Sequence, residues 1–444
     1  MRRILLISII AVLVVGSVFV LSYSHKVIFS PEIAPPGAAG SVVAKPDSSI
    51  PEAPAKVVAT PVTPKNTDSP IQQKLANPPE VIKAIYLTGW SAGSASKINQ
   101  VIDLAKKTGI NAVVIDIKDY SGYVSYAMDV PLAKSSGAEK QLRIIYPNEL
   151  IKKLHDNNIY AIARITAFQD PILAEARPDL AVKNKTTGGV WKDNKGLAWL
   201  DPAGKESWDY LVSIADDSLF RGFDEINFDY VRFPSDGALS NMGFPFYDSA
   251  TEKHEVLRNF FSYLRSHIDG KISADLFGLT TVAQDDMGIG QVIEDAAQYF
   301  DYVSPMVYPS HYAAGFIGYK TPANYPYEVI SYSLNNAVNK FLKIPVGPDG
   351  KAPKLAQIRP WLQGFNLGAT YTPSMINDEI KAVTDSLCVT EPTATEAVEL
   401  AGLTGPSRKC GSGEADIRKS MYGGWMMWDA ANLYTNTKAA LSSN

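Results

Sequence analysis

The sequence has few of the residues that most often bind metals. Its 444 residues include only two cysteines, Cys388 and Cys410, and five histidines. Two cysteines cannot complete a four-ligand zinc site, and the histidines do not have the spacing of metal ligands. We therefore expect a protein that uses no metal and no other cofactor.

An excess of positive charge is also absent. The 42 lysines and arginines are outnumbered by 46 acidic residues, which gives a net charge of -4. A nucleic-acid partner would call for a basic stripe, so we expect no nucleic-acid binding. Aromatic residues, in contrast, are plentiful, with 22 Tyr, 16 Phe and 7 Trp. Their flat faces suit a carbohydrate site, although most of them can equally be core.

The longest uncharged run lies at the N-terminus. Arg2 and Arg3 precede an uncharged segment over residues 4–23, and about 20 residues suffice to span a bilayer. The run ends in Leu-Ser-Tyr-Ser-His-Lys, which is a poor cleavage site for a signal peptide. The flanking arginines place the N-terminus in the cytoplasm. We therefore expect residues 1–29 to be an uncleaved signal anchor of a single-pass cell-membrane protein, rather than a cleaved signal, and the rest to be extracytoplasmic.

Two segments differ in composition from a folded core. Residues 30–80 are rich in Pro, Ala, Ser and Thr without helical or strand periodicity, which predicts an extended, semi-rigid linker. The segment over residues 387–419 is too long and too polar for a plain loop, which indicates an insertion. This insertion holds Cys388 and Cys410, which we expect to form a disulfide if the domain is outside the cytoplasm.

From residue 81 to residue 444, short apolar segments alternate with longer amphipathic ones, as in repeated βα units. We predict strands at residues 84–88, 112–117, 160–167, 225–232, 272–278, 302–308, 358–365 and 424–428. We predict helices that include residues 96–108, 147–157, 205–217, 250–268, 291–299 and 373–386. Eight strands indicate an α/β fold of the (β/α)8 TIM-barrel type. An open doubly wound sheet would usually show a glycine-rich phosphate turn after an early strand, and the first strand ends instead in Thr-Gly-Trp-Ser.

The fourth predicted strand carries the most polar groups. Because strand side chains alternate between two faces, Glu225, Asn227 and Asp229 share one face, and Ile226 and Phe228 share the other. The apolar face must pack on the helices, so the polar face points into the barrel, with Asp229 near its mouth. Glu225 and Asn227 can alternatively belong to a buried structural network.

Three motifs carry a resemblance to a known family. They are Asp-Glu-Ile-Asn-Phe-Asp-Tyr-Val-Arg-Phe-Pro at 224–234, Val-Ile-Asp-Ile-Lys-Asp at 114–119 and Pro-Met-Val-Tyr-Pro-Ser-His-Tyr at 305–312. Over residues 82–435 the chain resembles a bacterial family of uncharacterised glycoside hydrolase domains, TIM barrels distantly similar to those of amylases and α-galactosidases. In the related barrels the carboxylate that ends strand four is the nucleophile, and the resemblance assigns this role to Asp229.

Glycoside hydrolysis needs a second carboxyl group to protonate the leaving oxygen. Asp275 on the fifth predicted strand is the candidate, because amylase-type barrels carry their acid on that strand. The alternative is a structural Asp hydrogen-bonded near Ser273. Amylases use Glu at this position and Arg two residues before the nucleophile, where this chain has Asp275 and Asn227, so the match is not to the amylases proper.

Further polar and aromatic residues are predicted near the barrel mouth, where they can bind sugar or serve packing and structural hydrogen bonds. Asp116 and Lys118 share a strand face and can alternatively pair with each other, and Arg164 and Arg232 can orient a carboxylate. The candidate substrate-binding residues are Asp116, Lys118, Asp119, Arg164, Asn227, Arg232, Tyr308, His311, Gln363 and Trp428.

These observations predict a membrane-anchored glycoside hydrolase that cleaves a cell-envelope or extracellular polysaccharide with Asp229 and Asp275. The alternative is a barrel that binds envelope glycan as a scaffold without cutting it. A metal-dependent polysaccharide deacetylase is disfavoured, because no Asp-Asp pair accompanies a His-x3-His spacing.

Overall fold

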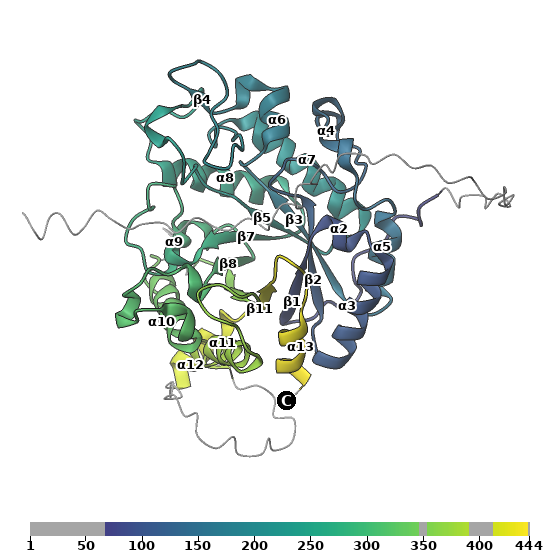
Figure 1. Cartoon of the computed structure of the whole chain (residues 1–444), viewed down its shortest axis with the longest axis vertical. Coiled ribbons are helices and arrows are strands. Elements are labelled where there is room, and N and C mark those ends of the chain that lie inside the picture. Colours follow the sequence, from purple (N-terminus) through teal and green to yellow (C-terminus); the bar gives the residue numbers. More distant parts are fainter. Residues whose placement is uncertain (1–66, 346–352, 390–411, 443–444) are drawn as a thin grey trace, which may run out of the picture.

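The computed structural model describes residues 67–345, 353–389 and 412–442, which fold into one barrel surrounded by helices (Figure 1). The sheet is parallel throughout and runs in the order β10-β11-β1-β2-β3-β5-β7-β8-β9, and β10 also pairs with β8. The strands are β1 (Ile82–Leu87), β2 (Ala112–Lys118), β3 (Tyr160–Thr166), β5 (Glu225–Asp229), β7 (Lys271–Phe277), β8 (Tyr302–Met306), β9 (Gln357–Ile358), β10 (Trp361–Gln363) and β11 (Gly424–Trp428).

The barrel closes with eight strands, because β9 and β10 are two parts of one strand. Both pair with β8, at Tyr302 and Val303 for β9 and at Met306 for β10. Arg359 and Pro360 separate the two parts, and Pro360 has no backbone N–H to donate to a neighbouring strand. All eight predicted strands are present, so the predicted barrel is confirmed.

Helices cover the outside of the barrel (Figure 1). The longer ones are α3 (Ala95–Thr108), α5 (Pro147–His155), α7 (Lys205–Arg221), α8 (Lys253–His267), α10 (Pro326–Phe341), α11 (Pro373–Ser386) and α13 (Thr435–Ser442). The remaining helices and strands are α2 (Gly89–Ala92), α4 (Pro131–Ser136), α6 (Pro171–Ala176), α9 (Ile293–Ala296), α12 (Ser412–Ser420), β4 (Lys183–Asn184) and β6 (Met242–Gly243). The helix predicted at 291–299 is reduced to the single turn of α9, and α10 was not predicted.

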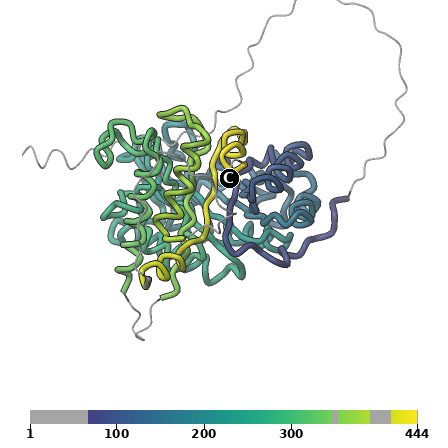
Figure 2. Tube along the Cα trace, turned by 90° about the horizontal axis from the view of Figure 1, so that it is seen from below, coloured from purple at the N-terminus to yellow at the C-terminus, as the bar shows by residue number. Residues whose placement is uncertain are grey.

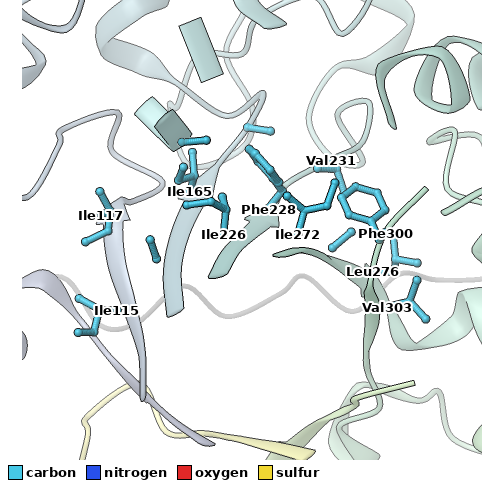
Figure 3. Close-up of a cluster of buried hydrophobic side chains, with 14 of the residues drawn as sticks. Ile115, Ile117, Ile165, Ile226, Phe228, Val231, Ile272, Leu276, Phe300 and Val303 are labelled. Carbon is cyan, nitrogen blue, oxygen red and sulfur yellow. The ribbon is translucent and has the colours of Figure 1, made fainter. Parts of the chain in front are cut away.

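The two faces of β5 point as the alternation predicts. Ile226 and Phe228 are fully buried in the hydrophobic layer between the strands and the helices, where Figure 3 shows them beside side chains of neighbouring strands. On the opposite face, Glu225 and Asn227 contact side chains of other strands inside the barrel. Glu225 forms a fully buried ion pair with Arg359, so it belongs to the structural network that the sequence left open.

The folded body begins earlier than residue 81. The Asp68 carboxylate accepts hydrogen bonds from the backbone N–H groups of Asn148 and Glu149 in the first turn of α5, at 2.9 and 3.0 Å. Leu75 donates its backbone N–H to Asp224 at 2.7 Å and packs against the hydrophobic cluster inside the barrel. Residues 68–75, which we predicted to be linker, are therefore part of the barrel unit.

Other predictions fall partly or wholly outside the described residues. No helix within residues 67–345, 353–389 and 412–442 is long and apolar enough to cross a membrane, and the span predicted at 4–23 lies outside them. The predicted insertion is described only at its two ends, of which the second begins α12. Cys388 is disulfide-bonded, and Cys410, the other cysteine of the chain, lies outside the described residues.

Candidate active site

A cavity of about 500 Å³ opens at the carboxyl ends of the barrel strands. Of the twelve catalytic and substrate-binding residues predicted from the sequence, six line this cavity and six do not. The six are Arg164, Asp229, Asp275, Tyr308, His311 and Trp428. Ligand sites of TIM barrels lie at this end, so the cavity is the candidate active site.

Arg164 is the centre of the polar part of this site. Its guanidinium donates to Asp116 at 2.5 Å, forms an ion pair with Asp229 and lies with Nε 3.5 Å from Asp275 Oδ2. These side chains come from β2, β3, β5 and β7, which are consecutive strands of the barrel. One buried cation therefore faces three buried carboxyl groups, so the cluster carries an excess of acid.

Asp275 is held by hydrogen bonds to one of its oxygens. Oδ1 accepts from the side-chain amide of Asn227 at 2.8 Å and from the indole N–H of Trp361 at 2.7 Å. Burial, together with the charge of Asp229, raises the pKa of the Asp275 carboxyl to about 8. Asp275 is therefore largely protonated at neutral pH, with Oδ2 as the oxygen that can carry the proton.

Asp116 forms an ion pair with Arg164 and helps to fix the position of its guanidinium. It accepts a hydrogen bond from the Tyr86 hydroxyl at 2.5 Å in addition to that from Arg164. Burial raises the pKa of the Asp116 carboxyl. Asp116 is not among the residues that line the cavity, so it positions Arg164 instead of contacting a ligand directly.

An aromatic wall faces the carboxyl groups. Trp428 stacks on Tyr86 with ring centroids 3.8 Å apart, and the Arg164 guanidinium lies 5.2 Å from the Trp428 ring centroid. Tyr308 and His311 meet edge to face at 5.0 Å. Burial lowers the pKa of His311 to about 4, so its imidazole is neutral at physiological pH and can donate or accept a hydrogen bond.

Four predicted substrate-binding residues lie away from the cavity. Lys118 is fully buried, 2.9 Å from Asp170 in an ion pair, and does not pair with Asp116. Asp119 pairs with Arg143 at 2.9 Å. The other two are Arg232, packed among the rings of Trp199, Tyr230 and Phe277, and Gln363, which bonds to the backbone of Ser310, Phe365 and Leu367.

Asn227 is also corrected, because it is fully buried and reaches Ser273 and Asp275 but not the cavity. Two residues that contact the carboxyl groups of the site, Tyr86 and Trp361, were not predicted from the sequence. Both could have been found by the alternation of strand faces, since Tyr86 shares a face with Ala84 and Trp361 shares one with Gln363. Leu433 and Asn436, which follow the last strand and line the cavity, carry no such signal.

Among the described residues, no group of three or more His, Cys, Asp or Glu side chains is arranged to hold a metal ion. The cavity therefore offers the carboxyl group of Asp275, the Asp229 carboxylate paired with Arg164, and several aromatic rings. A third carboxyl group, that of Asp429, accepts the backbone N–H groups of Ala431 and Leu433 in the turn after β11.

A family model described as "Putative glycosyl hydrolase domain" matches residues 84–390, which is more than half of the chain. The chain belongs to this family. The match covers β1 through α11, including Asp229 and Asp275, and ends before β11 and the cavity residues that follow it. No curated protein is significantly similar to the chain.

One of three similar solved structures, described first, supports the fold of this glycosyl hydrolase family member. The PgaB (BpsB) glycoside hydrolase domain from Bordetella bronchiseptica is 11% identical, with coverage of 82% of this chain and 98% of that one and a TM-score of 0.52. A hypothetical protein from Ruminiclostridium thermocellum is 41% identical over 46% of this chain and 98% of its own, with a TM-score of 0.40. The α-galactosidase TtGalA from Thermus thermophilus is 10% identical over 84% and 62% of the two chains, with a TM-score of 0.42.

Proposed function

We propose that the protein hydrolyses glycosidic bonds of a cell-envelope or extracellular polysaccharide. The observation that carries the proposal is the pairing of Asp229 and Asp275 in one cavity, at the ends of neighbouring barrel strands. Paired carboxyl groups in different protonation states are what glycoside hydrolysis requires. Membership of the glycosyl hydrolase family supports the same reaction.

The two carboxyl groups have different tasks in the proposed reaction. Asp275 donates its proton to the glycosidic oxygen, because its pKa of about 8 keeps the proton available at neutral pH. The Asp229 carboxylate, positioned by its ion pair with Arg164, attacks the anomeric carbon as the protonated leaving group departs. Water then cleaves the glycosyl ester on Asp229 and gives a proton back to Asp275, which restores both carboxyl groups. Trp428, Tyr308 and His311 contact the sugar rings from the aromatic wall.

The test compares the whole chain with its Asp229→Asn variant on a panel of bacterial envelope polysaccharides and aryl glycosides. We expect the wild type to release reducing ends and the variant to be slower by at least about a hundredfold, because the reacting carboxylate is lost. Asp269→Asn is the matched control, since Asp269 is exposed and precedes the start of β7, whereas the cavity lies at the carboxyl ends of the strands. Wild-type turnover by Asp229→Asn would exclude the proposed role of Asp229.

The alternative function is a scaffold that binds glycan without cutting it. It is favoured by the tight pairing of Asp229 with Arg164 and by the deep burial of Asp275, which is 1% exposed. The same experiment separates the two functions. Binding of a glycan without release of reducing ends, by wild type and variant alike, would favour the scaffold.

We further propose that residues 4–23 anchor the protein in the cell membrane, with the N-terminus in the cytoplasm and the barrel outside. The uncharged run after Arg2 and Arg3 supports this arrangement. We expect the whole chain to fractionate with membranes and the barrel to be digested by protease added to cells stripped of their wall. A barrel that stays protected in such cells would contradict this topology.

A further inference from the structure

A second hollow, of about 310 Å³, lies beside the candidate active site between α3 and α13. Lys97 and Lys107 of α3 and Lys438 of α13 line it, and we call it the lysine groove. Figures 1 and 2 show these two helices, which contact each other, where β1 and β11, the first and last strands of the barrel, pair. Leu433 and Thr435 line both hollows, so only the ridge formed by these two residues separates the groove from the cavity.

The lysine groove is positively charged, although the protein has a net charge of -4. Asp103 is the single acidic residue of its lining. Within the described part of the chain, neither Lys107 nor Lys438 forms an ion pair. Lys97 donates one hydrogen bond to the backbone oxygen of Asn432, at 3.1 Å, and its charge also acts on the carboxyl group of Asp429, without an ion pair among the described residues. The groove therefore offers its positive charge to a ligand.

The ridge between the two hollows is built in advance of any ligand. The Asn432 side chain accepts from the backbone N–H of Thr88 at 3.0 Å and donates to the backbone oxygen of Tyr86 at 3.2 Å. Asp429 accepts the backbone N–H of Leu433 at 3.1 Å. Leu433 stays 63% exposed on this fixed turn. A chain that passes from the cavity into the groove would cover this apolar side chain.

We propose that the lysine groove binds anionic groups of a polysaccharide whose neighbouring residues occupy the cavity, so that the substrate is an acidic polymer. This proposal rests on the proposed hydrolase function, whose substrate it narrows. Lysine acts as a point charge and accepts carboxylates and phosphates alike. Uronic acids and sugar or polyol phosphates share the chemistry that the groove recognises, and the experiment distinguishes them.

The test measures binding by the whole chain in the Asp229→Asn background, so that the polymer stays uncut. The variant carries Lys97→Gln, Lys107→Gln and Lys438→Gln together. The probes are polygalacturonate, a phosphomannan, and neutral dextran, all of which contain glycosidic bonds. Because exposed charge pairs are individually weak and three of them are lost together, we expect the variant to bind one or both acidic probes about tenfold more weakly. Added salt should weaken binding by the parent in the same direction.

The matched control replaces Lys106, Lys140 and Lys343 by Gln, which are exposed and lie outside the groove. An equal loss in the control, or unchanged binding of both acidic probes by the groove variant, would overturn the proposal. Release of reducing ends by the wild-type chain reports separately on hydrolysis. Groove-dependent binding without such release would support the groove and contradict the proposed hydrolase, whereas release with unchanged affinity would contradict the groove alone.

Discussion

Arg164 determines the electrostatics of the site at the scale of single residues. It is buried and forms hydrogen-bonded ion pairs with Asp116 and Asp229. Asp275 is farther away, with its Oδ2 3.5 Å from the Arg164 Nε. Ionising all three carboxyl groups around one guanidinium would leave two negative charges uncompensated in a buried site. Such a cluster lowers its free energy by keeping protons. Burial is the main cause of the raised pKa values of Asp275 and Asp116, and the charge of Asp229 raises the pKa of Asp275 further.

The proton on Asp275 makes the stability of the protein depend on pH. The folded-state pKa of about 8 lies above the ordinary value of 3.8, so the contribution of Asp275 is complete below pH 4 and is lost as pH rises through 8. Asp275→Asn removes the ionisable group but keeps an oxygen for Asn227 and Trp361. We expect the variant to gain stability relative to the wild type as pH rises from 5 to 9, by on the order of 3 kcal/mol at pH 9. Urea unfolding across this pH range measures the difference.

The control for this measurement is Asp269→Asn at an exposed position, where we expect the difference from the wild type to stay constant between pH 5 and 9. A difference that is also constant for Asp275→Asn would show that Asp275 is already ionised at pH 5. Asp275 could then not be the proton donor of the proposed reaction.

At the scale of elements, the sequence predicts strands well but not every side-chain direction. The eight strands are short apolar runs, and the polar face of β5 follows from simple alternation. Alternation fails in β2, because the register with β3 shifts between Asp116 and Lys118. Lys118 then pairs with Ile165, whose side chain lies in the outer hydrophobic layer, and reaches Asp170 there. Such a shift arises from the packing of two strands and has no local signature in either.

The seventh barrel strand shows the same limit. Pro360 marks an interruption, but only the folded barrel shows that the break lets Arg359 reach Glu225 on the other side of the interior. Trp361 follows directly and turns its indole N–H to Asp275. Gln363 lies on the same face, beneath the loop that follows β10. Its side-chain amide bonds to backbone groups of Ser310, Phe365 and Leu367. The position of a loop over a strand end depends on the whole barrel, so Gln363 was misassigned from sequence.

The whole molecule has a closed and an open end. At the end where the strands begin, the Glu225–Arg359 pair fills the interior, and Leu75 packs against the cluster formed by residues such as Ile82 and Tyr160. At the other end the cavity is open to solvent, and the lysine groove lies beside it on the outside of the barrel, between α3 and α13. The segment over residues 68–75 runs from the start of α5 to this closed end and therefore belongs to the fold, although its composition is that of a linker.

We expect a chain shortened to begin at residue 78 to be less stable than one that begins at residue 67. It loses the Asp68 cap of α5, which contributes about 1 kcal/mol, and the half-buried Leu75, which contributes a similar amount. The total loss should be about 2–3 kcal/mol, and urea unfolding of the two shortened chains measures it.

The single change Asp68→Ala in the longer chain isolates the cap. It should account for about 1 kcal/mol of the loss, because it removes both hydrogen bonds to the first turn of α5 and the negative charge near the helix N-terminus. Glu80→Ala is the control, since Glu80 is exposed and lies outside the segment that contacts α5. If the chains that begin at residues 67 and 78 had equal unfolding midpoints, residues 68–75 would not contribute to the stability of the barrel. They would then belong to the linker, and the folded unit would begin at Val81.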